Sequence, residues 1–253
     1  MLRAAYVDMD GTLLGRRASL FHDDEGAFTM LGARALEACW RADVEVVPYS
    51  GRRQSTLLHN GVMLGVRSWI YEAGCGMVVD GEVVPLVDEA DDSGANALLL
   101  SRFPLEMYDP WNRGRESSRL YLGQDVDAAE ADELLIEEGF GAWRLVDNGV
   151  MHGASAGGRA YHLVPRSASK AAAVARHMQA RGLVADEVIA IGDSMEDLGS
   201  ASVVGTFWLV ANAEPAVHDA ARAIENVRVC EGANGAGVYE AIITELAERR
   251  TGP

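Results

Sequence analysis

The chain has 253 residues, of which 49% are hydrophobic and 24% are charged, so it can fold as one large or two small domains and is not expected to be disordered. Its net charge is -16 and its pI is about 4.7, so nucleic acid and anionic membranes are excluded as expected partners. No apolar run approaches the roughly 18 residues of a spanning helix, and the N-terminal residues show no signal-peptide pattern, which predicts a cytoplasmic protein.

Short runs rich in β-branched residues alternate with helical patterns along most of the chain. The predicted strands cover residues 4–8, 44–50, 68–72, 187–193 and 206–211, and the predicted helices cover residues 30–42, 170–182 and 236–250. Apolar strands joined by helices indicate a parallel sheet that is covered on both faces. The predicted fold class is therefore α/β, with a Rossmann-like parallel-sheet core.

The middle of the chain follows a different pattern. A hairpin is expected at 77–85, because Asp80-Gly81 is a good two-residue turn, and an acidic helical stretch follows it. Three strands are predicted next, at 118–123, 143–149 and 159–165, with a helix at 127–138 between the first two. Strands grouped around helices indicate a small inserted α+β module. We therefore expect a core domain of residues 1–85 and 166–253 and an inserted domain of residues 86–165.

Polar motifs follow three of the predicted core strands. They are Asp8-Met9-Asp10-Gly11-Thr12, Ser50-Gly51-Arg52 and Gly192-Asp193-Ser194. Ligands of open parallel sheets bind at the carboxyl ends of the strands, so the three motifs are expected to meet there. Each motif alone also has a structural interpretation, as a turn, a loop or a helix cap. Their combination favours a functional site.

The residue types in these motifs match the needs of phosphoryl transfer. Asp8, as an ionised carboxylate, can attack phosphorus and form an acyl phosphate. Asp10 can protonate the leaving oxygen and then activate water, if a sharp turn at Gly11 brings it over the substrate. Neighbouring carboxylates and a phosphoryl group repel one another, so a hard cation is required. Asp193 and Asp197 can bind that cation, and Mg²⁺ is the candidate.

The motifs together resemble those of the haloacid dehalogenase superfamily. DMDGTLL at 8–14, YSGR at 49–52, SASK at 167–170 and GDSMED at 192–197 are similar to its four motifs, in order and spacing. The inserted module lies between the second and third motifs. This position resembles the subclass with an α/β cap, which includes Cof-like, sucrose-phosphate and mannosylphosphoglycerate phosphatases. The resemblance implies a magnesium-dependent phosphatase that forms an aspartyl phosphate at Asp8.

The resemblance also implies roles for individual residues. The implied catalytic residues are Asp8, Asp10 and Lys170, and the implied phosphate-binding residues are Asp8, Met9, Asp10, Ser50, Gly51 and Lys170. The implied metal residues are Asp8, Asp10 through its carbonyl, Asp193, and Asp197 in the outer shell. Lys170 is the single lysine, and it would fall on this motif position by chance about once in 253. At two positions the chain departs from the family pattern: Glu196 replaces a common Asn, and Glu72-Ala73-Gly74 replaces a common Glu-Asn-Gly.

The inserted module is expected to select the substrate. The candidate substrate contacts are Arg52, Arg113, Arg115, Arg119, His152 and His162. Arginine can bind a carboxylate or a second phosphate with two hydrogen bonds, which favours a small sugar phosphate or related anionic ester. Alternatively, these arginines are solvated or pair with the surplus acidic residues. A monomer or small homo-oligomer is expected.

Two other functions stay open. One is a phosphosugar mutase or another phosphotransferase, which is disfavoured because the module follows the second motif. The other is a non-catalytic protein that binds a phosphorylated ligand. Intact acidic residues and Lys170 disfavour this second alternative.

Overall fold

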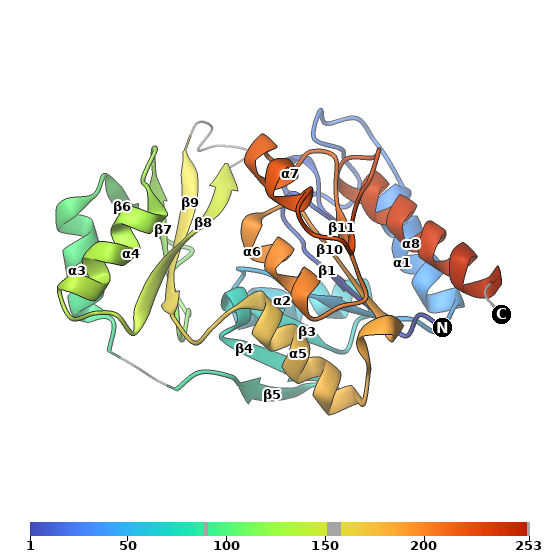
Figure 1. Ribbon diagram of the computed structural model, residues 1–253, viewed down its shortest axis with the longest axis horizontal. Helices are drawn as coiled ribbons and strands as arrows, with labels where there is room; N and C mark the ends of the chain where they lie inside the picture. The colour runs from blue at the N-terminus through green and yellow to red at the C-terminus, as the bar shows by residue number, and fades with distance from the viewer. Residues whose placement is uncertain (89–90, 151–157, 252–253) are drawn as a thin grey trace.

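The computed structural model describes residues 1–88, 91–150 and 158–251 and confirms the predicted α/β fold class (Figure 1). Its central sheet is parallel, with the strand order β12-β11-β10-β1-β2. The strands are β1 (Ala4–Val7), β2 (Glu45–Pro48), β10 (Val188–Gly192), β11 (Thr206–Leu209) and β12 (Val227–Val229). Val7 of β1 is aligned with Pro48 of β2 and Ile191 of β10. The loops after these strands therefore leave the sheet at the same edge.

Helices cover both faces of this sheet, as predicted (Figure 1). The helices are α1 (Leu31–Arg41), α2 (Gln54–Leu64), α5 (Lys170–Arg181), α6 (Met195–Leu198), α7 (Pro215–Ala221) and α8 (Asn234–Thr251). Successive strand side chains point to opposite faces, so Ala5 and Val7 join a core with α1 and α8. Ala4 and Tyr6 join a second core with α5, α6 and α7. Among the described residues, no helix is both long and apolar enough to cross a membrane.

A second, antiparallel sheet contains β3 (Trp69–Tyr71), β4 (Gly76–Val79) and β5 (Glu82–Pro85). The hairpin expected at 77–85 is confirmed as β4 and β5. The assignment of residues 68–72 to the parallel sheet was wrong, because β3 pairs along its length with β4 and meets β2 only through a bridge between Tyr49 and Ile70. The backbone turns back directly after β3 at Glu72 and Ala73, both with positive φ, which returns the chain onto β3.

A third sheet, also antiparallel, lies in the middle of the chain. Its order is β6-β7-β9-β8, and two helices pack on it. The elements are α3 (Ser93–Arg102), β6 (Leu105–Met107), β7 (Arg119–Gly123), α4 (Ala128–Glu137), β8 (Trp143–Val150) and β9 (Arg159–Pro165). Helices α3 and α4 cover the face turned away from the central sheet, and the other face is turned toward it (Figure 1). The described residues also form four 3-10 turns: Arg16–Ala18, Glu72–Gly74, Ala185–Glu187 and Gly199–Ser202.

Candidate active site

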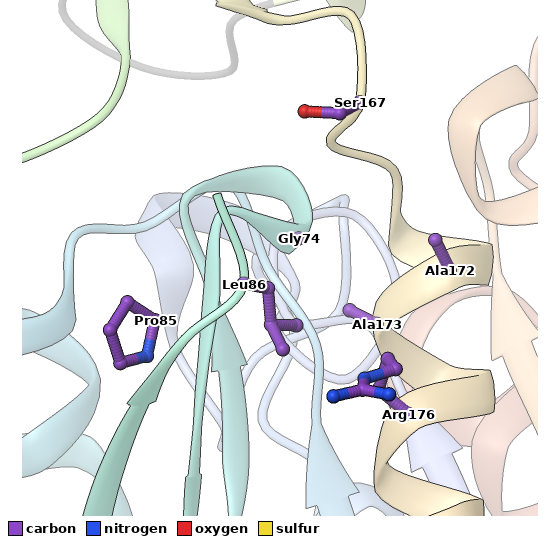
Figure 2. A pocket seen from close by; sticks show the side chains of 7 residues that line it. All are labelled: Gly74, Pro85, Leu86, Ser167, Ala172, Ala173 and Arg176. Atoms are coloured by element: carbon purple, nitrogen blue, oxygen red, sulfur yellow. The ribbon is translucent and has the colours of Figure 1, made fainter. Parts of the chain in front are cut away.

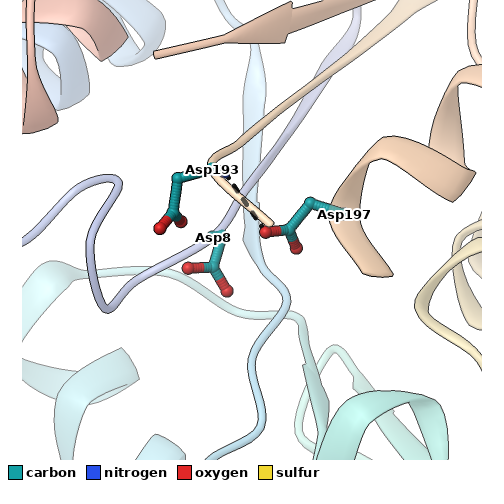
Figure 3. A group of neighbouring side chains, drawn as sticks. All are labelled: Asp8, Asp193 and Asp197. Carbon is teal, nitrogen blue, oxygen red and sulfur yellow. Dashed lines mark hydrogen bonds between the residues drawn. The ribbon is translucent and has the colours of Figure 1, made fainter. Parts of the chain in front are cut away.

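Three carboxylates meet at the carboxyl edge of the central sheet. Asp8 follows β1, Asp193 follows β10, and Asp197 lies in α6. Figure 3 shows that their side chains converge, and one oxygen of each lies within 4.8 Å of the others. Asp8 and Asp197 are only 5% and 1% exposed. Segments almost two hundred residues apart in the sequence thus form one buried acidic cluster.

Lys170 lies inside this cluster. It is the first residue of α5, whose N-terminus is capped by the side chain of Ser169. The Lys170 Nζ is 2.6 Å from Oδ1 of Asp8 and 2.6 Å from Oδ1 of Asp197, and the side chain is buried. It also lies 4.9 Å from the centre of the Tyr49 ring. Burial lowers the pKa of Lys170, but the charges of Asp197 and Asp8 outweigh it and raise that pKa, so Lys170 is a permanent cation.

The loop after β1 is held against Asp193. Gly11 has a φ of 86°, and a Cβ at this position would lie 2.4 Å from Oδ2 of Asp193, so a side chain would collide with the carboxylate. Thr12 Oγ1 donates a 2.6 Å hydrogen bond to Asp193 Oδ1. The side-chain amides of Asn212 and Asn234 donate to the Gly11 carbonyl at 2.7 and 2.8 Å. Neither asparagine was predicted from the sequence; Asn212 lies in the loop after β11, and Asn234 is the first residue of α8.

Asp10 lies beside the acidic cluster and is bound by Arg52. The two side chains form two hydrogen bonds of 2.6 Å each. The Asp10 side chain is 47% exposed, so it lies at the rim of the site. Arg52 also donates to Asn60 at 3.0 Å. Arg52, a candidate substrate contact, is therefore occupied with orienting Asp10 in this structure.

The charges of the cluster suit a bound cation. Burial, followed by repulsion from Asp197 and Asp193, raises the pKa of Asp8 well above its usual value, although Lys170 opposes the rise. Burial and Asp197 also raise the pKa of Asp193 to about 7. With all three carboxylates ionised, one lysine would leave two unbalanced negative charges in a buried place, and the raised pKa values of Asp8 and Asp193 reflect that excess. A divalent cation with oxygen ligands fits this donor set.

Both departures from the expected motifs contact the third sheet, since Ala73 shares a small core with Val146 of β8 and Val164 of β9. Glu196 forms an ion pair with Arg144 of β8, with N–O distances of 2.8 and 3.1 Å. It therefore faces this sheet. Asp197 keeps its helix-cap role as well as its place in the cluster, because its carboxylate accepts from Ser194 Oγ at 2.6 Å.

Glu72 connects the core with the loop before β7. Its buried carboxylate accepts hydrogen bonds from the backbone amides of Glu116 and Ser117 at 3.0 Å and from Ser118 Oγ at 2.7 Å. The sequence showed only that Glu72-Ala73-Gly74 was unusual. The structure adds that this segment fixes the loop at residues 116–118.

Two of the candidate substrate arginines have ordinary structural surroundings. Arg119 pairs with Asp92 at 2.8 Å, which matches the alternative that the arginines balance acidic residues. The Arg113 side chain is exposed, and its carbonyl accepts a hydrogen bond from Arg53. His152 lies outside the described residues.

The remaining two candidates face the core. His162 of β9 is 3% exposed and lies against Gly51 of the second motif. Arg115 is partly buried and donates to Ser118 Oγ at 3.0 Å.

A surface cavity of about 350 Å³ lies away from the acidic cluster (Figure 2). It is lined by the chain segments that lead into and out of the third sheet, at Pro85-Leu86 and Ser167, and by residues of α5, including Arg176. The acidic cluster contributes no residue to it.

A Rossmann-like sheet with carboxylates and a buried lysine at its carboxyl edge is the arrangement of an α/β enzyme that handles phosphate groups. A family of haloacid dehalogenase-like hydrolases matches residues 144–242. Two relatives named phosphoglycolate phosphatase come from Pyrobaculum aerophilum and Archaeoglobus fulgidus. The first is 30% identical, over 93% of this chain and 92% of its own length. The second is 28% identical, over 95% of each chain.

Among solved structures, the sucrose-phosphatase of Synechocystis sp. PCC6803 has a TM-score of 0.74 and 15% identity, over 97% of this chain and 98% of its own. At this identity the likeness concerns the fold alone. The chain belongs to the haloacid dehalogenase-like hydrolases. Within that family it is a phosphatase.

Proposed function

We propose that the protein is a magnesium-dependent phosphomonoesterase that acts on a small phosphorylated metabolite through an aspartyl phosphate at Asp8. The observation that carries the proposal is the buried cluster in which Lys170 contacts both Asp8 and Asp197 beside Asp193. A buried cation next to a carboxylate nucleophile can neutralise the negative charge of the phosphoryl group as it is transferred.

Each step uses a residue of the core. Asp8 attacks phosphorus, the bond to the leaving oxygen breaks, and Asp10 gives that oxygen its proton. Asp10 then takes a proton from water, whose oxygen attacks the phosphorus of the aspartyl phosphate. The acyl phosphate bond breaks, phosphate leaves, and the Asp8 carboxylate is restored. Arg52 keeps the Asp10 carboxylate oriented at the rim, where the leaving group departs.

The phosphoryl oxygens would be bound by the backbone of Met9 and Asp10, by Ser50 and Gly51, and by Lys170. Mg²⁺ would be held by Asp8, Asp10 and Asp193, with Asp197 in the outer shell. When bound, it supplies the positive charge that the cluster lacks.

We further propose that residues 86–165 form a cap domain over a core of residues 1–85 and 166–253. Contacts between the two parts support a closed arrangement. They include Glu72 with residues 116–118, Arg144 with Glu196, and Arg159 with Glu214. Closing such a cap excludes water and completes the site around a bound substrate.

The substrate is proposed to be a small anionic ester rather than a larger sugar phosphate. Relatives that match more than nine tenths of the chain are named phosphoglycolate phosphatase, whereas the sucrose-phosphatase shares only the fold. Phosphoglycolate is therefore the first substrate to test. The cytoplasmic location and the monomeric or small oligomeric state stay predictions.

Phosphate release from a panel of esters tests this function. We expect purified protein with Mg²⁺ to hydrolyse phosphoglycolate in preference to sugar phosphates, and EDTA to abolish turnover. Asp8→Asn should lower turnover by at least about 10⁴-fold, because it removes the nucleophile. The exposed Asp24→Asn serves as the matched control. Full activity of Asp8→Asn contradicts the covalent mechanism, and phosphate transfer to an added sugar in place of water identifies a phosphotransferase.

A further inference from the structure

Arg115 is a partly buried cation without a carboxylate partner among the described residues. Its hydrogen bonds go to neutral oxygens, Ser118 Oγ at 3.0 Å and the Trp111 carbonyl at 3.3 Å. Burial lowers the pKa of Arg115. A buried charge is costly unless an opposite charge compensates it. The position is therefore suited to an anion that is not part of the described chain.

Three other arginines around the site have carboxylate partners, unlike Arg115. Arg52 pairs with Asp10, Arg119 with Asp92, and Arg144 with Glu196. The nearby acid, Glu72, directs its carboxylate to the amides of residues 116 and 117 and to Ser118. The Glu72 charge raises the pKa of Arg115, but no ion pair joins the two side chains within the described residues.

His162 is a second buried group of the third sheet that lacks a partner. Neither ring nitrogen forms a hydrogen bond to any described residue, and Nδ1 is fully buried. The ring lies over the second motif, because a Cβ built on Gly51 would be 2.8 Å from Cε1 and 3.1 Å from Nε2 of His162. Burial and the charges of Arg115 and Lys170 lower the pKa of His162. A neutral imidazole can donate one hydrogen bond and accept one.

A chain of hydrogen bonds fixes Arg115 relative to the second motif. Arg115 donates to Ser118 Oγ, and Ser118 Oγ donates to the Glu72 carboxylate at 2.7 Å. The Glu72 backbone amide in turn donates to the Arg52 carbonyl at 2.9 Å. The guanidinium is thus held at a defined distance from Ser50-Gly51, with His162 packed on Gly51. Both Arg115 and Lys170 lie close enough to His162 for their charges to lower its pKa.

We propose that Arg115 determines substrate specificity by binding a carboxylate on the leaving-group side of a short phosphate ester, next to the neutral imidazole of His162. This assignment rests on the proposed phosphatase site at Asp8. A guanidinium can bind a carboxylate with two parallel hydrogen bonds, and the ligand charge would compensate the buried cation. His162 can use Nε2, the ring nitrogen that is not fully buried, on the same carboxylate or on the ester oxygen. Phosphorylated hydroxy acids have this chemistry, and neutral sugars lack it.

Binding to the Asp8→Asn variant tests the assignment without turnover. The probes are phosphoglycolate and ethyl phosphate, which has a methyl group in place of the carboxylate, and calorimetry in the presence of Mg²⁺ gives both dissociation constants. We expect phosphoglycolate to bind more tightly. Arg115→Gln, added to the Asp8→Asn variant, keeps a donor for Ser118. It should raise the dissociation constant of phosphoglycolate by about 10- to 100-fold and change that of ethyl phosphate by no more than about twofold.

Matched variants separate recognition from folding. Arg102→Ala removes an exposed arginine from α3 and should change neither affinity. Arg115→Lys should keep part of the preference for phosphoglycolate over ethyl phosphate, because lysine supplies the positive charge but not the two parallel N–H donors of a guanidinium. If Arg115→Gln does not fold, Arg115→Lys carries the test, with a smaller but still selective loss. The assignment is overturned if phosphoglycolate binds no more tightly than ethyl phosphate, or if the folded Arg115 variant weakens both ligands equally.

The phosphatase proposal fails separately. If the wild-type protein releases no phosphate from any ester while the preference for phosphoglycolate depends on Arg115, the carboxylate assignment stands and the hydrolytic function does not. If phosphate is released but the Arg115 variants bind phosphoglycolate and ethyl phosphate with unchanged relative affinity, the hydrolytic function stands and the carboxylate assignment does not.

Discussion

The two sides of the active site differ in whether their charged groups are paired. At the edge of the central sheet, Lys170 forms ion pairs with Asp8 and Asp197, and Asp10 forms an ion pair with Arg52. On the opposite side, the partly buried Arg115 and the buried His162 have no charged partner among the described residues. Paired groups hold a fixed geometry, which a chemical step needs. Groups with unused hydrogen-bonding capacity are suited to a ligand, so chemistry and recognition are divided between the two sides.

The contacts that join the two sides use buried carboxylates of the core. Glu72 and Glu196 each bind a different part of the third sheet or its loops, while the neighbouring Asp197 stays in the acidic cluster. The division is therefore testable at three places: in the core, at the junction, and in the proposed cap.

After loss of the nucleophile Asp8, the largest effect is expected at Asp10 in the core. Asp10→Asn should lower kcat by about 10²–10⁴-fold for alkyl phosphates, because the leaving oxygen then lacks its proton donor. An aryl phosphate with a good leaving group should lose much less. Steady-state kinetics with both substrates measure the difference, with Asp24→Asn as the control. An equal loss for both substrates would assign Asp10 a positioning role, as the partner of Arg52.

A smaller effect is expected at the junction, at Glu72. Glu72→Gln leaves one acceptor oxygen where two oxygens now accept three hydrogen bonds, so we expect a loss of about 1–3 kcal/mol in the free energy of unfolding. KM for phosphoglycolate should rise, because the Ser118 loop that holds Arg115 loosens. Urea unfolding and kinetics measure the two effects, and the exposed Glu82→Gln is the control. Unchanged unfolding would show that the loop does not depend on Glu72.

The smallest effect is expected in the pH dependence of stability, through His162. Burial holds the pKa of His162 well below its usual value, so the unfolded chain takes up a proton first as the pH falls. The free energy of unfolding should therefore decrease below pH about 6.5, by at most about 1.4 kcal/mol per pH unit for this histidine. Urea unfolding at pH 7 and pH 5 measures the slope, and His162→Gln should reduce it.

His177 is the matched comparison within the core. Burial also lowers the pKa of His177, and its Nδ1 is hydrogen-bonded to the Tyr6 hydroxyl at 2.9 Å. His177→Gln should likewise reduce the slope but leave phosphoglycolate affinity unchanged, whereas His162→Gln should weaken it. Equal effects of the two variants on affinity would contradict a ligand-facing role for His162.

The sequence determined the residues of the core cluster and the sheet that presents them. Apolar strands followed by Asp8, Ser50 and Asp193 predicted one edge of a parallel sheet. The motif resemblance added Lys170, the single lysine, to the same site. These inferences succeed because strand periodicity and turn chemistry are local properties of the chain. Helix α2 was not predicted, and neither were the short elements β6, β12 and α7, in which a few residues carry little periodicity.

Only the tertiary structure decided which charges meet. The arginines 52, 115 and 119 looked alike in the sequence, yet one binds Asp10, one binds Asp92, and Arg115 has no carboxylate partner among the described residues. Likewise, Glu72 gained a role only when folding brought residues 116–118 against it. Such pairings join segments from distant parts of the chain, and burial sets their strength. Neither the distance nor the burial can be read from the order of residues.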